Sequence, residues 1–371
     1  MKRIPVAEPC FNGNEKKYVN DCLDTTWISS VGSYINRFEE CFAEYCGVKH
    51  ALTCCNGTVA LHLPLLAYGV GPGDEVIVPT FTYIATANAV RYCGAKPVFA
   101  DCCSDTWNVD PQTVEEAITP HTKGIIVVHL YGNPVEMDAI MAIANKHKLF
   151  VIEDAAEAHG ALYKGKRVGA IGHVGTFSFF GNKVITTGEG GMITTDDGAL
   201  ASKMRTLKGQ GMDPNRRYWF PEIGYNYRMT NIEAALGLAQ LENIEFHLGQ
   251  RQRVKELYQK HLKRLSEYID FQTEQPGGHN IVWMFSILLS ENVKCSRDEV
   301  MVRLTEMGIE TRPLFYPLHT MPPYLEENGN YPVAEDLALR GLNLPTYSRM
   351  TEEDVEFICL SLEKILTGVQ Q

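Results

Sequence analysis

A single lysine, Lys183, lies in a stretch that is otherwise made mostly of apolar, small and hydroxylated residues. The residues before it, Val174–Phe180, alternate and then run apolar as a buried strand does, and Met192–Thr195 begins a second strand. The glycine-rich segment Thr186–Gly191 disfavours a helix between them. A lysine between two buried strands loses its proton more readily, and only a neutral amine attacks a carbonyl group. The pattern therefore indicates a Schiff-base lysine, with a solvated lysine on a surface turn as the alternative.

Two further residues follow predicted strands and carry groups that suit a flat, charged ligand. Asp154 comes directly after Leu149–Glu153, the most apolar strand of the chain, and Tyr83 follows Glu75–Pro79. Ligands of parallel α/β sheets bind at the carboxyl ends of the strands. Asp154 could hold a proton on a heteroaromatic nitrogen, and Tyr83 could stack on a ring. Capping of the next helix and packing in the core are the respective alternatives.

A phosphate cradle is the fourth element of this set. In the segment CNGTVALH, Gly57 and Thr58 open a helix after the strand Ala51–Cys54. We expect Thr58 to cap this helix and Gly57 to let backbone amides approach an anion closely. An ordinary capped helix is the alternative. An amine, a partner for a ring nitrogen, a stacking ring and a phosphate cradle are together the groups that pyridoxal phosphate (PLP) requires.

Composition excludes several other classes of protein. The 371 residues carry a formal net charge of −11, which argues against a general binder of nucleic acid or membrane surfaces. The eleven cysteines have no zinc-binding spacing, so we expect reduced thiols, a cytoplasmic protein and no metal. The sequence has no signal-peptide core and no apolar run that could span a bilayer. Gly160–Lys166 matches the first part of a P-loop, but Arg167 stands where Ser or Thr should bind Mg²⁺.

Strands and helices alternate through the first two thirds of the chain. The expected strands are Ala51–Cys54, Glu75–Pro79, Pro97–Ala100, Gly124–Val128, Leu149–Glu153, Val174–Phe180 and Met192–Thr195. The expected helices are Asn14–Leu23, Phe38–Tyr45, Thr58–Leu66, Ala85–Tyr92, Pro111–Ala117 and Met137–Lys148. This order predicts an α/β fold with a seven-stranded, mostly parallel sheet.

The pattern changes near Asn243, where we expect a second domain. A long amphipathic helix, Asn243–Tyr268, is followed by a strand at Ile281–Leu289, a helix near Arg297–Met307, a proline-rich loop at Arg312–Tyr324 and a final helix from Thr351. We therefore predict a large α/β domain over residues 1–244, with an N-terminal helical segment, and a smaller α+β domain over residues 245–371.

These residues resemble the nucleotide-sugar aminotransferase (DegT/StrS) family of fold-type I PLP-dependent transferases. The resemblance covers essentially the whole chain, and its markers are CNGTVALH, EVIVPTFTYIATANA, VHLYG, VIEDAAEAHG, TFSFFGNKVITTGEGGM, GYNYRMTNIEAALG and IETRPLFYPLH. It implies that Lys183 forms the Schiff base with the cofactor and that Asp154 pairs with its ring nitrogen. Some relatives have His in place of this lysine and catalyse deoxygenation, so Lys183 implies transamination.

The same resemblance assigns the remaining cofactor contacts. Tyr83 would stack on the ring, and Gly57, Thr58 and Ser178 would bind the phosphate. Glu157 stands where many relatives have Gln near the cofactor's hydroxyl group. Asn226 would reach the phosphate of the neighbouring subunit, which implies an obligate homodimer with shared active sites.

Asp24–Ile35 and Lys208–Asn231 resemble one branch of this family most. That branch transfers the amino group of L-glutamate to C4 of GDP-4-keto-6-deoxy-D-mannose, for the O-antigen of lipopolysaccharide and other surface polysaccharides. Arginine binds phosphate at two points at once, and surface ion pairing is its alternative role. The expected substrate-binding residues are Arg216, Arg217, Arg228 and Arg312 for the diphosphate, and Trp27, Ser29, Ser30, Tyr316 and His319 for the sugar site.

Two other functions compete with this interpretation. One is a related aminotransferase that acts on a UDP- or dTDP-linked keto-sugar or on an eight-carbon keto-acid sugar. The other is a non-catalytic regulator with the same fold, which would be expected to lack the cofactor lysine or its aspartate. Both Lys183 and Asp154 are present.

Overall fold

The computed structural model describes residues 3–327 and 329–368. Its helices are α1 (Glu15–Asp24), α2 (Ser33–Cys46), α3 (Gly57–Ala67), α4 (Ala85–Tyr92), α5 (Pro111–Glu116), α6 (Met137–His147), α7 (Gly198–Lys208), α8 (Asn231–Glu242), α9 (Ile244–Leu262), α10 (Arg297–Glu306), α11 (Pro332–Arg340) and α12 (Glu352–Thr367). Its strands are β1 (His50–Cys54), β2 (Glu75–Pro79), β3 (Lys96–Ala100), β4 (Thr122–Val128), β5 (Phe150–Asp154), β6 (Leu162–Tyr163), β7 (Lys166–Arg167), β8 (Val174–Ser178), β9 (Gly191–Thr195), β10 (Ile269–Phe271), β11 (Gly278–His279), β12 (Phe285–Leu289), β13 (Arg312–Pro313) and β14 (Gly341–Leu344).

A seven-stranded sheet forms the centre of the fold, in the order β1-β9-β8-β5-β4-β2-β3. The strands β8, β5, β4, β2 and β3 run parallel, whereas β9 is antiparallel to both of its neighbours. The predicted α/β class and the mostly parallel sheet are therefore confirmed. The order places the ends of β5 and β8, with Asp154 and Ser178, side by side in the middle of the sheet.

Alternate residues of the central strands face two separate helical layers, as the pleat of a strand requires. Val76 and Ile152 pack in a core with α3, α4 and α7. Ile77 and Val151, one residue away on the same strands, pack in a core with α5 and α6. A further core joins α2 and α8 to the sheet. The strands are thus buried on both faces, which explains their continuous apolar sequence.

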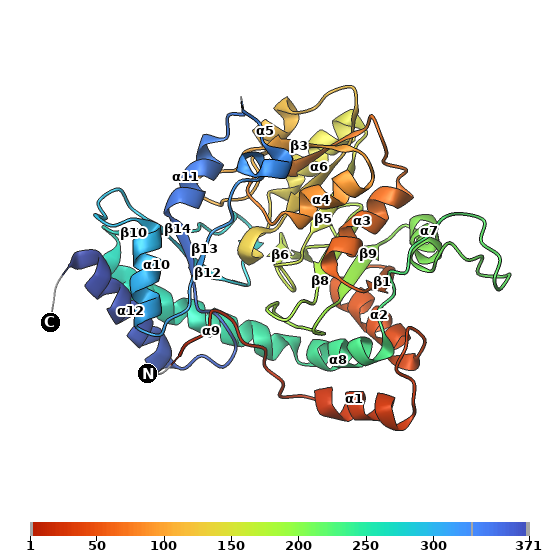
Figure 1. The fold of residues 1–371 in the computed structure, drawn as a ribbon, viewed down its shortest axis with the longest axis horizontal. Helices are drawn as coiled ribbons and strands as arrows, with labels where there is room; N and C mark the ends of the chain where they lie inside the picture. Colours follow the sequence, from red (N-terminus) through yellow and green to blue (C-terminus); the bar gives the residue numbers. More distant parts are fainter. Residues whose placement is uncertain (1–2, 328, 369–371) are drawn as a thin grey trace.

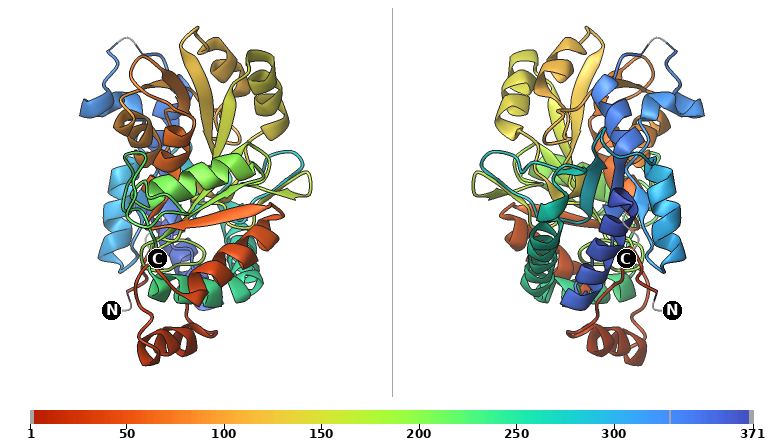
Figure 2. Two further views of the ribbon diagram at one scale, coloured as in Figure 1. Left: turned by 90° about the vertical axis from the view of Figure 1, so that its right-hand side faces the viewer. Right: turned by 90° about the vertical axis from the view of Figure 1, so that its left-hand side faces the viewer.

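The C-terminal elements gather around a four-stranded antiparallel sheet, β10-β12-β14-β13. Figure 1 shows this sheet with α10 and α12 on one side of the molecule, and α9 and α8 running along the lower edge toward α1. In both views of Figure 2 the red helix α1 lies at the lower edge, away from the strands. The N-terminal segment also joins the C-terminal elements, because Ile4 N donates to Gly308 O at 2.9 Å. The division into domains at residues 244 and 245 stays a prediction.

Several expected boundaries differ from the structure, among them the start of α2, which lies at Ser33 and not at Phe38. The helix expected to reach Tyr268 ends at Leu262 and continues only as a short 3-10 turn over Lys263–Leu265. The strand expected from Ile281 begins at Phe285, because Val282 has a φ of 51° and breaks the extended backbone. The predicted loop after Arg312 contains the short strand β13. No helix within residues 3–327 and 329–368 meets the length and hydropathy needed to cross a bilayer.

Candidate active site

The Lys183 side chain is buried in the turn between β8 and β9, with 11% of its surface exposed. Its Nζ lies 3.9 Å from Glu157 Oε1. Burial lowers the pKa of Lys183 below that of an ordinary lysine, and Arg312 lowers it further, whereas Glu157 and Asp154 act in the opposite direction. The structure buries this side chain, so the alternative of a solvated lysine on a surface turn is wrong, and the catalytic role of Lys183 stays a prediction.

Two buried carboxyl groups face this amine. Asp154, at the end of β5, accepts hydrogen bonds from Thr86 Oγ1 at 2.9 Å and from Ala156 N at 3.2 Å. Burial raises the pKa of Asp154, although these two donors and Lys183 partly offset the effect. Glu157 accepts one hydrogen bond, from Tyr131 N at 2.8 Å, and burial raises its pKa to about 7. The site therefore holds two acidic groups and one amine whose proton affinities differ from their ordinary values.

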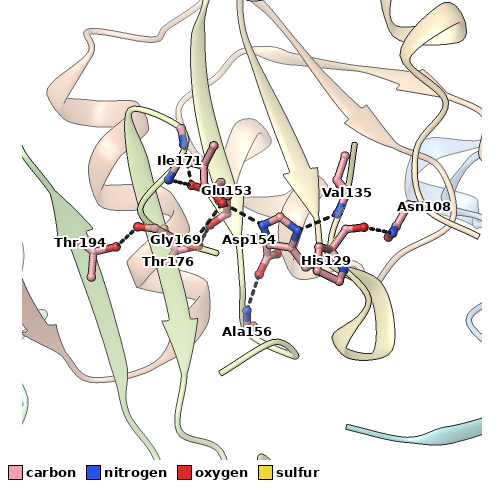
Figure 3. Close-up of polar contacts among 12 residues, drawn as sticks. Asn108, His129, Val135, Glu153, Asp154, Ala156, Gly169, Ile171, Thr176 and Thr194 are labelled. Atoms are coloured by element: carbon pink, nitrogen blue, oxygen red, sulfur yellow. Dashed lines mark hydrogen bonds and ion pairs between the residues drawn. The ribbon is translucent and has the colours of Figure 1, made fainter. Parts of the chain in front are cut away.

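The carboxylate of Glu153, which lies directly beside Asp154 in the sequence, accepts four hydrogen bonds. Figure 3 shows the Glu153 side chain among its donors, with Asp154 turned toward Ala156. Glu153 accepts from His129 Nε2 at 3.0 Å and from the backbone N–H groups of Gly169, Ile171 and Gly172 at 2.8, 2.7 and 2.6 Å. These contacts tie the segment between β7 and β8 to β5. They fix the strand that carries Asp154.

The phosphate-cradle residues meet where β8 ends and α3 begins. A Cβ added at Gly57 would lie 2.6 Å from Ser178 Cβ, so only glycine allows these backbones to approach so closely. The expected cap at Thr58 is wrong. Asn56 is the N-cap, and its side chain accepts from Val59 N at 3.0 Å, because it has the extended backbone that a cap requires. Thr58 lies instead in the first turn of α3.

A row of aromatic rings leads from the exposed surface to Lys183. The ring centroids of Tyr83 and Phe315 are 6.0 Å apart, those of Phe315 and Tyr131 are 5.3 Å apart, and those of Tyr131 and Trp283 are 6.2 Å apart. Lys183 Nζ lies 3.8 Å from the centroid of the Trp283 ring. Tyr83 itself is 59% exposed, so its ring is accessible to a ligand. The sequence analysis missed the other three rings.

The four arginines expected to bind a diphosphate occupy different places. Arg312 is half-exposed and close enough to Lys183 to lower its pKa. Arg228 is partly buried, and its Nε has no hydrogen-bond partner in the described part of the chain. Arg216 and Arg217 lie on the exposed loop between α7 and α8, where each guanidinium packs on a neighbouring ring. Figure 1 shows this loop extending beyond the body of the molecule. Arg216 and Arg217 are thus not brought to Lys183 by contacts within the described chain.

Asn226 lies near the start of α3. It forms a bridge with Gly209, and the next residue, Tyr227, accepts a hydrogen bond from Cys55 N at 3.1 Å. The Asn226 side chain is exposed. A contact with the neighbouring subunit stays a prediction.

The residues expected at the sugar site are divided between surface and core. Tyr316 is half-exposed, whereas His319 is buried. The ring nitrogens of His319 contact Thr80 Oγ1 at 2.7 Å and Glu335 Oε1 at 3.1 Å, so both are occupied within the chain.

The remaining sugar-site residues belong to an exposed loop beside the start of α8. Asn231 Nδ2 donates to the Trp27 carbonyl at 2.7 Å, and Asn231 N donates to the Ser29 carbonyl at 2.7 Å. These bonds leave the side chains of Trp27 and Ser29 exposed and that of Ser30 partly exposed. Their role in sugar binding stays a prediction.

Taken together, an amine with a lowered pKa, two buried carboxyl groups and a helix N-terminus can hold an anionic aldehyde and move a proton beside it.

Comparisons with known proteins agree with this chemistry. Residues 9–363 match the model of the DegT/DnrJ/EryC1/StrS aminotransferase family. A protein of Caulobacter vibrioides named GDP-perosamine synthase is 54% identical over 99% of both chains. A protein of the same name from Escherichia coli O157:H7 is 50% identical over 98% of this chain and 99% of its own. The solved structure of DesI, in the presence of its TDP-sugar product, has a TM-score of 0.93 and 32% identity, and the match covers 99% of this chain and 94% of that one.

Proposed function

The chain belongs to the DegT/DnrJ/EryC1/StrS aminotransferase family, and from that premise we propose that it is a PLP-dependent aminotransferase that makes GDP-perosamine. The amino group of L-glutamate is transferred to C4 of GDP-4-keto-6-deoxy-D-mannose, and 2-oxoglutarate is released. The observation that carries this proposal is the 54% identity to a GDP-perosamine synthase over 99% of both chains.

The residues of the site fit the proposed cofactor. Gly57 and Ser178 approach too closely for any side chain at position 57, and they border the N-terminus of α3, where a phosphate is favoured. Asp154 would hold the ring nitrogen, and exposed Tyr83 would cover the ring. Glu157 lies next to Lys183 and would face the hydroxyl group of the ring. PLP, when bound, supplies an aldehyde and an electron-accepting ring.

In the proposed reaction, the main role of the protein side chains is to hold and move protons. Lys183 Nζ, whose pKa is lowered by burial, would accept a proton from Cα of glutamate and release it again. The Asp154 carboxylate, fixed by Thr86 and Ala156, would keep a positive charge on the ring nitrogen. The partner-free Nε of Arg228 and the half-exposed Arg312 are the best supported cations for the diphosphate.

A panel of nucleotide-linked 4-keto sugars tests the substrate. The purified protein, with PLP and L-glutamate, is expected to release 2-oxoglutarate with the GDP-linked sugar and much less with UDP- or dTDP-linked sugars. The likeness to DesI, a structure determined with its TDP-sugar product, makes the dTDP-linked sugar the main competitor. Turnover with that sugar and none with the GDP-linked sugar would refute the substrate and leave the aminotransferase intact.

The homodimer with shared sites needs its own test. Lys183→Ala and Asn226→Ala chains, each inactive alone, are mixed and refolded together. If Asn226 serves the partner's site, about a quarter of the wild-type activity should return, since half of the dimers are mixed and each has one intact site. If Asn226 serves its own site, no activity should return. The proposal includes no nucleic-acid or membrane partner.

A further inference from the structure

Trp283 is the residue in closest ring contact with the Lys183 amine. The Nζ atom lies 3.8 Å from the centroid of the indole ring, and the Trp283 side chain is buried. The two residues are 100 positions apart in the sequence. Trp283 belongs to the irregular segment between β11 and β12, so this contact joins the C-terminal elements to the turn that carries the lysine.

Three hydrogen bonds fix the position of Trp283. Its indole Nε1 donates to the carbonyl of Asn182 at 2.8 Å, which holds the residue directly before Lys183. Its backbone N donates to Tyr131 O at 2.9 Å. Its carbonyl accepts from Nη1 of the buried Arg251 at 2.7 Å. The ring is therefore held rigidly against both the lysine side chain and the lysine backbone.

The face of an indole ring attracts a cation and has no such attraction for a neutral amine. The charged groups that act on Lys183 are Glu157, Asp154 and Arg312. Glu157 contacts Nζ at 3.9 Å, which is slightly longer than the distance from Nζ to the ring centroid. The ring is thus at least as close to the amine as the nearest carboxylate, and it attracts the charged form more strongly than the neutral form.

We propose that Trp283 is a positioning residue for Lys183, whose ring face holds the ammonium form while its indole N–H fixes the turn that carries the lysine. Once Lys183 loses its proton, the attraction to the ring weakens and the amine can move toward a carbonyl group. The inference rests on the proposed function, in which the neutral amine is the reactive form.

The test measures the proton affinity of Lys183 in the full chain freed of cofactor. The protein is labelled with trace acetic anhydride over a pH series, and the Lys183 peptide is quantified by mass spectrometry. Trp283→Leu should lower the pH midpoint of labelling by about one unit, which is a roughly tenfold rise in reactivity at a fixed pH below the midpoint. Trp283→Phe keeps an aromatic face and should shift the midpoint less. A simple gain in access would raise labelling at every pH without moving the midpoint.

Matched controls separate this effect from a general loss of packing. Met284→Leu changes a buried neighbour, and exposed Lys164 provides an internal reference in every sample. Neither should show a shifted midpoint. Wild-type protein grown with fluorinated tryptophan keeps the shape of the ring but weakens its negative face, so its Lys183 midpoint should also fall. This measurement needs no destabilising substitution.

An unchanged Lys183 midpoint in the fluorinated protein and in both Trp283 variants would overturn the inference. Added PLP distinguishes this outcome from a failure of the proposed function. If the inference alone is wrong, wild-type protein will still capture PLP on Lys183. If the proposed function is wrong, it will not do so, whatever the midpoints are.

Discussion

Glu153 and Asp154 are neighbours on β5 and are both buried, yet their surroundings are opposite. Glu153 accepts four hydrogen bonds, one from His129 and three from backbone N–H groups. Asp154 accepts two from the described residues, namely from Thr86 and Ala156. Figure 3 shows both carboxylates in one view. Successive side chains of a strand point to opposite faces, so the two groups belong to different regions of the molecule.

The Asp154 region also contains Glu157 and Lys183, and here burial dominates. It raises the pKa of Asp154 and of Glu157 and lowers that of Lys183. Around Glu153, in contrast, the hydrogen bonds offset the desolvation of the carboxylate. We propose that the Glu153 region holds the fold together and that the Asp154 region, with fewer internal hydrogen bonds, is left to bind a ligand. The following predictions test this difference, starting with the largest expected effect.

Removal of the amine should abolish catalysis and spare the fold. Lys183→Ala is expected to reduce turnover roughly 10⁴-fold, because Lys183 is the group proposed to move the proton. The variant should still bind PLP or its aminated form, and both can be followed by absorbance. Lys164→Ala, a change at an exposed lysine, is the control. Full turnover by the Lys183 variant would contradict the account.

Removal of the Glu153 carboxylate should instead destabilise the fold. Glu153→Leu leaves three backbone N–H groups and the His129 Nε2–H without an acceptor in the interior. We expect the free energy of unfolding to fall by about 3–5 kcal/mol, as measured by urea denaturation. Glu116→Leu, at an exposed position, is the matched control. A loss below about 1 kcal/mol would mean that these bonds do not stabilise the fold.

Asp154→Asn should affect activity far more than stability. The substitution keeps an acceptor for Thr86 and removes a charge that is costly to bury, so the free energy of unfolding should change by less than about 1 kcal/mol. The rate should fall roughly 10²-fold or more, because a neutral amide cannot keep a ring nitrogen charged. Equal losses of stability in Asp154→Asn and Glu153→Leu would remove the distinction between the two regions.

The pH dependence of stability should reveal Glu157. The pKa of Glu157 is raised to about 7 in the folded state. Its contribution to the free energy of unfolding is therefore fully present below the pKa that it has in the unfolded chain, and it is lost as the pH rises from there through 7. Glu157→Gln has no such titration and can still accept from Tyr131. Between pH 5 and pH 8, the wild type should lose about 2–3 kcal/mol relative to this variant. Urea denaturation at the two pH values checks the difference, and parallel curves would contradict it.

The local sequence predicted well the part of the candidate site near the ends of β5 and β8 and the start of α3. Asp154 and Gly57 lie at a strand end and a helix start, and Lys183 lies in the turn after β8, so the alternation of strands and helices was enough to predict their places. Ser178 was added by the family resemblance alone. Asn56 was missed as the cap because Thr58 is an equally good capping residue by type.

The row of aromatic rings beside Lys183 could not be predicted in this way. Tyr131 has a φ of 55°, which bulky residues rarely adopt, and its ring contacts and hydrogen bonds join it to Phe315 and Trp283, which are distant in the sequence. Trp283 follows a break at Val282 that gives no signal in a strand-like apolar run. The short strand β14 was also missed, because its place depends on pairing with β12 and β13 and not on its own pattern.

The most direct test of the account is to identify the lysine that captures the cofactor. The protein is incubated with PLP, reduced with borohydride and digested, and the peptides are examined by mass spectrometry. We predict one phosphopyridoxyl group per chain, attached to Nζ of Lys183. Modification of another lysine with Lys183 left unmodified, or no modification at all, would contradict the central claim.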